Sequence, residues 1–182
     1  MYVVSLRQSA LPRMAHLFRG LGIKMVHFYI GTNYEEFAVH HKRLREHSQL
    51  FKNAFDLLNN EFFPFLQRTL GPKTSLSPQN RGICLVTSKD NPQGMETLVE
   101  YLYSPSLPEN MTFKAIMSLY RLADRFAIPG LLNKLMDYIR ESHKVSGKEF
   151  RPKQVKYIFN HRSNGDGKLW KYCAAQVLGN LM

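Results

Sequence analysis

The sequence predicts a mixed α/β fold of the α+β kind, in which a small sheet of short strands is flanked by helices. Three observations lead to this prediction: two β-rich runs close together near the start, a third in mid-chain, and a series of helical apolar stripes after it. A length of 182 residues allows one domain with a sizeable core and appended elements. The hydrophobic fraction of 44% and the charged fraction of 21% are ordinary for a globular protein.

The first two strands are expected to form a hairpin. Residues 25–30 read MVHFYI and residues 35–40 read EEFAVH, and the residues between them include Gly31 and Asn33, which favour a turn. A third strand is predicted over 82–87, GICLVT.

Two short helices are predicted after the hairpin. Leu44, Ser48, Phe51 and Phe55 recur at spacings of four, three and four, which places them on one helical face. Ser48 is the residue type that caps the start of a helix, so we expect the second helix to begin there.

Later helices have their own start signals. Asn91 and Pro92 predict a helix with Tyr103 near its end, and Thr112 caps the next apolar stripe. A third stripe begins at Leu131 and ends near His143. A hydrophilic linker is then expected over 143–151, followed by helices near 152–160 and 168–181.

The segment 56–80 is predicted to be a long insertion loop. It has three prolines and no clear period, yet it contains the aromatic residues Phe62, Phe63 and Phe65. Loops of this length are uncommon in compact domains. Two interpretations stay open: Phe62 and Phe63 bind a partner, or they cap the domain's own core.

The net charge of +11 is concentrated at the two ends of the chain. Residues 1–80 hold 10 Lys/Arg against 5 Asp/Glu, residues 81–142 hold 7 against 7, and residues 143–182 hold 8 against 2. This indicates a neutral folded module, over 24–143, with a basic N-terminal segment (1–23) and a basic helical extension (144–182).

We expect an intracellular protein of the cytoplasm or nucleus. Cys84 and Cys173 lie far apart and form no CxxC pair, which is typical of reduced thiols. No apolar run approaches the ~18 residues needed to span a membrane, so no membrane partner is expected. Because no acid precedes Glu35, mitochondrial import is a minor alternative.

The sequence offers no enzyme chemistry and no cofactor site. Successive residues point to opposite faces of a strand, so His40 and His41 would not converge on a metal ion. Cys84 sits mid-strand as a buried thiol, and no phosphate loop, nucleophile elbow or carboxylate pair is present in the sequence.

Nucleic-acid binding through the tail is the weaker alternative. Basic side chains alternate there with aromatic ones that could stack on bases, although aromatic residues at helical spacing more often belong to a core. The residues concerned are Lys148, Arg151, Lys153, Lys156, Arg162, Lys168 and Lys171, with Tyr157, Phe159, Trp170 and Tyr172.

Three segments together resemble the BTB/POZ family. They read HHKRLREHSQLFKNAF after the hairpin, METLVEYLYSPSL, and SLYRLADRFAIPGLLNKLMDYI, and the third is the most specific. The tail VKYIFNHRSNGDGKLWKYCAAQVL resembles the region after this domain in many stand-alone fungal members. The chain departs from the family in Ile23-Lys24, where an acidic entry to the first strand is usual, and in the long 56–80 segment.

The resemblance implies a BTB/POZ-type fold and a non-enzymatic protein–protein interaction module. It also implies that His40 ends the second strand and packs into the strand–helix junction, where Leu44, Phe51 and Phe55 build core. Two uses are implied as well: self-association with partner recruitment, and, as an alternative, recruitment of substrates to a cullin-RING ubiquitin ligase.

Particular residues are expected to serve these two uses. Family members often dimerise through an N-terminal helix, and here Leu11, Met14, Leu17, Phe18 and Leu21 form an apolar helical stripe. Tyr103 stands where cullin-binding relatives have a contacting tyrosine. Their apolar-x-Glu motif has no clean match between Asp56 and Glu61, so the cullin function remains the alternative.

Overall fold

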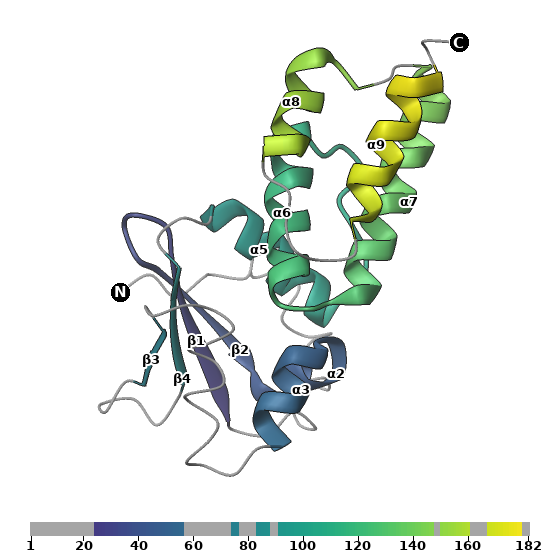
Figure 1. Ribbon diagram of the computed structural model, residues 1–182. Coiled ribbons are helices and arrows are strands. Elements are labelled where there is room, and N and C mark those ends of the chain that lie inside the picture. The colour runs from purple at the N-terminus through teal and green to yellow at the C-terminus, as the bar shows by residue number, and fades with distance from the viewer. Residues whose placement is uncertain are drawn as a thin grey trace.

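The computed structural model describes residues 24–56, 74–76, 83–87, 91–147, 150–160 and 167–179, with the backbone alone for 74–76 and 83–87. Its strands are β1 (Met25–Ile30), β2 (Glu35–His40), β3 (Thr74–Leu76) and β4 (Ile83–Thr87). Its helices are α2 (His41–His47), α3 (Gln49–Asp56), α5 (Pro92–Tyr103), α6 (Phe113–Arg125), α7 (Pro129–Ser146), α8 (Pro152–Asn160) and α9 (Lys168–Gly179) (Figure 1). None of these helices is long and apolar enough to cross a bilayer.

The strands form one sheet in the order β2-β1-β4-β3. Strands β1 and β2 pair antiparallel from Met25↔His40 to Ile30↔Glu35, which confirms the predicted hairpin. Strand β4 pairs in parallel with β1 and antiparallel with β3. The prediction of a loop over 56–80 was incomplete, because residues 74–76 form β3. Three residues are too few for an alternating pattern to reveal a strand.

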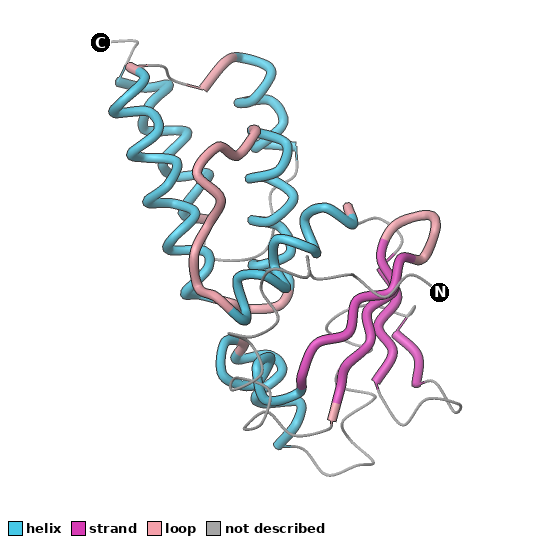
Figure 2. The backbone as a smooth tube through the Cα atoms, turned by 180° about the vertical axis from the view of Figure 1, so that it is seen from behind, coloured by secondary structure: helices cyan, strands magenta, loops and turns pink. Residues whose placement is uncertain are grey.

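The two ends of the molecule have different architectures. Figures 1 and 2 show the sheet with α2 and α3 at one end, and α6, α7, α8 and α9 gathered at the other. Helix α5 lies between them. The molecule is therefore a small sheet flanked by helices, as the sequence predicts.

An aromatic cluster joins the sheet to the helices. Val26, Phe28 and Ile30 alternate along β1 and are fully buried. The ring centroid of Phe28 lies 6.0 Å from that of Phe51 on α3 and 5.3 Å from that of Phe126 at the end of α6. Such contacts typically add about 0.5–1.5 kcal/mol each beyond the burial of their area.

Ser48 separates α2 from α3 and is almost fully buried, with 1% of its surface exposed. Its backbone N–H donates to the Leu44 carbonyl and ends α2. Its hydroxyl accepts the N–H of Phe51 at 3.1 Å and donates to the carbonyl of Phe126 at 2.5 Å. The predicted cap is confirmed, and it also reaches across to the turn between α6 and α7.

The start signals of α5 and α6 are confirmed as well. The side chain of Asn91 accepts the N–H of Gln93 at 3.1 Å, and that of Thr112 accepts the N–H of Ala115 at 3.3 Å.

Helix α7 ends later than predicted, at Ser146 instead of near His143. The buried apolar stripe stops at Ile139, and beyond it His143 packs on Phe150 and Tyr172. Gly147 then ends α7 with φ 59°, a left-handed conformation that glycine adopts without steric cost.

Candidate functional site around Tyr103

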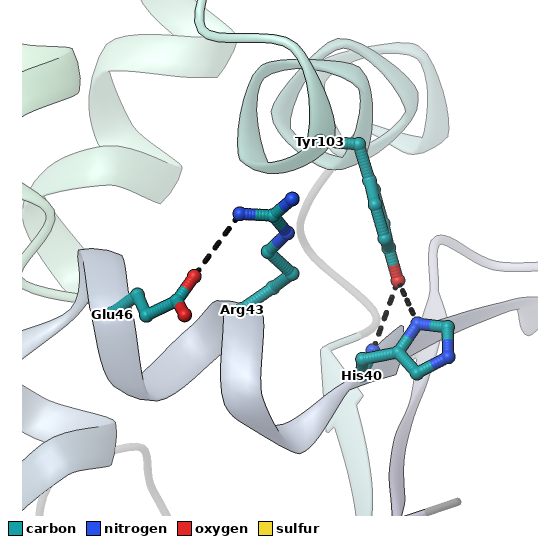
Figure 3. A network of polar contacts seen from close by, with 4 residues as sticks. All are labelled: His40, Arg43, Glu46 and Tyr103. Atoms are coloured by element: carbon teal, nitrogen blue, oxygen red, sulfur yellow. Dashed lines mark hydrogen bonds and ion pairs between the residues drawn. The ribbon is translucent and has the colours of Figure 1, made fainter. Parts of the chain in front are cut away.

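Tyr103, the last residue of α5, joins this helix to the junction between β2 and α2 (Figure 3). Its hydroxyl oxygen accepts the backbone N–H of His40 at 3.0 Å and lies 2.5 Å from Nδ1 of the same histidine. The two rings meet edge to face, with centroids 5.7 Å apart. The predicted packing of His40 into the strand–helix junction is therefore present, and Tyr103 is its partner.

Protonation of His40 is disfavoured at this position. Burial lowers the pKa of His40 from its ordinary value of 6.5, and the nearby charge of Arg43 lowers it further. A neutral imidazole accepts the Tyr103 O–H at Nδ1 while the phenol oxygen accepts the backbone N–H, so both groups are satisfied. Burial raises the pKa of Tyr103, which outweighs the opposing effects of the His40 N–H and Arg43.

Arg43 lies beside this contact. Its guanidinium carbon lies 5.9 Å from the centroid of the Tyr103 ring, and its Nη1 donates to Glu46 at 3.1 Å (Figure 3). The Arg43 side chain is 18% exposed, and its Nε is buried without a hydrogen-bond partner among the described residues. A cation over an aromatic face is attractive, and here it holds Arg43 against α5.

The other two histidines of this stretch also pack on aromatic rings. His41 stacks on Phe55 with centroids 3.6 Å apart, and His47 meets Tyr101 at 5.9 Å. Burial is the largest cause of the lowered pKa of each histidine. The three imidazoles thus face three different rings and do not converge on one point.

Lys134 of α7 also contacts the end of α5. Its ammonium lies 5.7 Å from the centroid of the Tyr101 ring and donates to the carbonyl of Pro105. The last turn of α5 is therefore held between α2 and α7.

The site consists of ring packing and polar contacts between β2 and the helices α2, α5 and α7. Within the described ranges, no group of three or more His, Cys, Asp or Glu could hold a metal ion. The polar side chains around Tyr103 bind one another across elements, and their hydrogen bonds orient rings and a guanidinium.

Of the protein-interaction residues predicted from the sequence, the structure describes Tyr103. Leu17, Phe18 and Leu21 lie outside the described residues, and so do Phe62 and Phe63. Sequence reasoning missed Arg43, Tyr101 and Lys134, because the contacts of Arg43 with Tyr103 and of Lys134 with Tyr101 join different helices. Glu46 was missed as well, although its spacing of three residues from Arg43 on α2 is a local signal. The pair of tyrosines, two residues apart at the end of α5, was another available signal.

Comparison with known proteins identifies the fold. A family model described as the BTB/POZ domain matches residues 24–143. Among solved structures, the BTB domain of human gigaxonin is similar at 14% identity and a TM-score of 0.44, covering 76% of this chain and 97% of that one. The BTB domain of zebrafish PATZ1 is similar at 13% identity and a TM-score of 0.46, covering 78% and 99%. No curated protein sequence matches the chain.

Replacement of Tyr103 by Phe tests the contact with His40. The ring would remain, but the His40 N–H and Nδ1 would lose their partner, so we expect a loss of about 1–2 kcal/mol in the free energy of unfolding. Urea denaturation measures this loss. Tyr34→Phe is the matched control, because Tyr34 is 53% exposed and should tolerate the change. Equal stability of the two variants would contradict the assigned role.

The three histidines predict that the protein loses stability on mild acidification. Their pKa values in the folded protein lie below the ordinary 6.5, so the unfolded chain binds more protons once the pH falls through this value. The free energy of unfolding should therefore decrease between about pH 7.5 and 6.0, as measured by urea denaturation. His41→Phe keeps an aromatic ring on Phe55 and should make this decrease smaller. A stability that does not change over this range would refute the prediction.

Proposed function

The chain belongs to the BTB/POZ family, whose model spans its residues 24–143, and we propose that it works by associating with itself and recruiting protein partners. The match to the family model is the observation that carries the proposal, because BTB/POZ domains are protein–protein interaction modules. The half-buried Tyr103 supports it, because contacts with His40 and Arg43 hold its ring in place before any partner arrives. We propose a non-enzymatic role on the same grounds.

Self-association is proposed through the N-terminal segment. Leu11, Met14, Leu17, Phe18 and Leu21 form the predicted apolar stripe, and the segment carries no acid before Glu35. An apolar stripe of this size in water is unfavourable, and a second subunit of a symmetric dimer would bury it.

Light scattering at tens of micromolar should accordingly give the mass of a homodimer. Changing Leu17, Phe18 and Leu21 together to Ser removes apolar area from the interface, and we expect the mass to fall toward that of a 21.2 kDa monomer. Arg13→Ser with Arg19→Ser, polar changes in the same segment, serves as the control and should leave the dimer intact. A monomeric mass for the unchanged protein would count against self-association.

Recruitment of substrates to a cullin-RING ubiquitin ligase is the second candidate. Tyr103 stands at the position where cullin-binding relatives have a contacting tyrosine, and the surrounding contacts fix its ring at the end of α5. Against it stands the missing apolar-x-Glu motif between Asp56 and Glu61. An interface that lacks an apolar anchor is expected to be weaker by roughly tenfold or more.

Titration calorimetry with a cullin N-terminal domain tests the ubiquitin-ligase function. We expect no binding in the micromolar range, because half of the contact is missing. Binding at about 1 μM or tighter would make the ligase function the leading one. In that event Tyr103→Ala should abolish the heat signal, whereas Tyr34→Ala should preserve it.

A further inference from the structure

Helices α8 and α9 are fixed to the rest of the protein by buried contacts. Ile158, Leu169 and Cys173 are at most 4% exposed and belong to the same core as the helices before them. The side chain of Gln176 lies 3.1 Å from Nδ1 of His143, so it joins α9 to α7. Figures 1 and 2 both show α9 alongside α7. The outer faces of α8 and α9 are therefore a fixed part of the surface.

The basic side chains on these faces lack acidic partners. Lys153 and Lys156 on α8 and Lys171 on α9 are exposed and have no ion pair or hydrogen bond with a described residue. Two arginines near the sheet do have acidic partners, Arg43 with Glu46 and Arg45 with Asp56. Since residues 143–182 hold 8 Lys/Arg against 2 Asp/Glu, the tail itself cannot neutralise this charge.

Exposed apolar side chains are concentrated in the same stretch of the chain. Five large hydrophobic side chains are exposed in the described part of the chain, and four of them lie between residues 145 and 178. They are Val145 at 79%, Phe159 at 41%, Val177 at 38% and Leu178 at 61%. Leu178 follows Lys171 by seven residues, two helical turns, so both lie on one face of α9. Phe159 likewise follows Lys156 by three residues on α8.

We propose that this tail surface, defined by Lys153, Lys156, Phe159, Lys171 and Leu178, binds an acidic segment of another protein with apolar residues at helical spacing. Carboxylates of such a segment would pair with the lysines, and its apolar side chains would cover Phe159 and Leu178. Complementary charge brings the two together and sets the register, while apolar burial contributes affinity. The tail surface is separate from Tyr103 and does not depend on self-association.

A protein segment fits the tail surface better than a nucleic acid does. A phosphate backbone offers no apolar group against which exposed aliphatic side chains such as Val177 and Leu178 could be buried. Stacking on bases needs free aromatic faces. Phe159 instead leans on Trp170, with ring centroids 5.7 Å apart and planes at 57°.

The test uses the full-length protein and a fluorescein-labelled synthetic peptide in an anisotropy titration. The peptide is about four helical turns long, built of Glu and Ala with Leu at every third or fourth position. Two further probes accompany it: the same peptide with each Leu replaced by Ser, and a single-stranded oligouridine of equal charge. We expect the Leu peptide to bind with a Kd of roughly 10 μM or tighter, and both other probes to bind at least about tenfold more weakly.

Charge reversal at the tail surface should remove the binding. The double change Lys156→Glu with Lys171→Glu should raise the Kd of the Leu peptide by roughly tenfold or more. Lys24→Glu with Lys52→Glu gives the same net charge from exposed positions near the sheet and should change the Kd by less than about twofold. Leu178→Ser alone should also weaken binding, because the side chain is mostly exposed and its loss should not disturb the fold.

Each opposite result would overturn the proposal. Equal losses in the two double variants would show that net charge attracts the peptide without a defined surface. If the Ser peptide bound as tightly as the Leu peptide, apolar contacts with Phe159 and Leu178 would not contribute to binding. Tighter binding of the oligouridine would show that the tail surface binds nucleic acid. Absence of Leu-peptide binding at about 100 μM would show that the tail surface does not bind such a segment.

Discussion

The buried hydroxyl of Ser48 is the contact on which the arrangement of the other elements depends. It accepts the N–H of Phe51 in the first turn of α3 and donates to the carbonyl of Phe126, which lies 78 residues later in the chain. The adjacent Gln49 N–H donates to the carbonyl of Ala127, whose backbone is left-handed with φ 48°. This hydroxyl has both of its hydrogen bonds inside the protein, and loss of either would leave a buried polar group unsatisfied, at a cost of about 1–3 kcal/mol. The direction of α2, and with it the position of Arg43 over Tyr103, follows from where Ser48 is anchored.

The three histidines of the junction act as aromatic side chains with a polar edge. In each case a neutral imidazole packs against the ring of a residue from another part of the fold. Burial together with the neighbouring basic side chains disfavours the charged form, because a second positive charge beside Arg43 or Arg45 would be repelled. The basic stretch thus remains compatible with a packed junction, since its arginines bear the charge and its histidines do not.

Features that depend on neighbouring residues could be predicted from the sequence. Contacts between residues far apart in the chain could not. The caps Ser48, Asn91 and Thr112 were predictable because a cap depends on a few neighbouring residues. The bond between His40 and Tyr103 spans 63 residues, and no periodicity indicates it; the resemblance to the family suggested that both positions matter but not that they meet. Strand β3 was missed because three residues carry too little pattern. The tail could be read as helical and basic, but its docking on α7 depends on contacts such as Gln176–His143 that arise from tertiary structure alone.

The tail helix α9 carries a chemical reporter of its own attachment. The Cys173 thiol is fully buried, and burial raises its pKa above the ordinary 9.0, so both access and the reactive thiolate are suppressed while α9 is docked. An alkylating reagent can reach this sulfur only after the helix has moved away from its neighbours. The labelling rate of Cys173 therefore measures how often the tail undocks, and a partner that clamps the tail in place would slow this reaction without touching the sulfur.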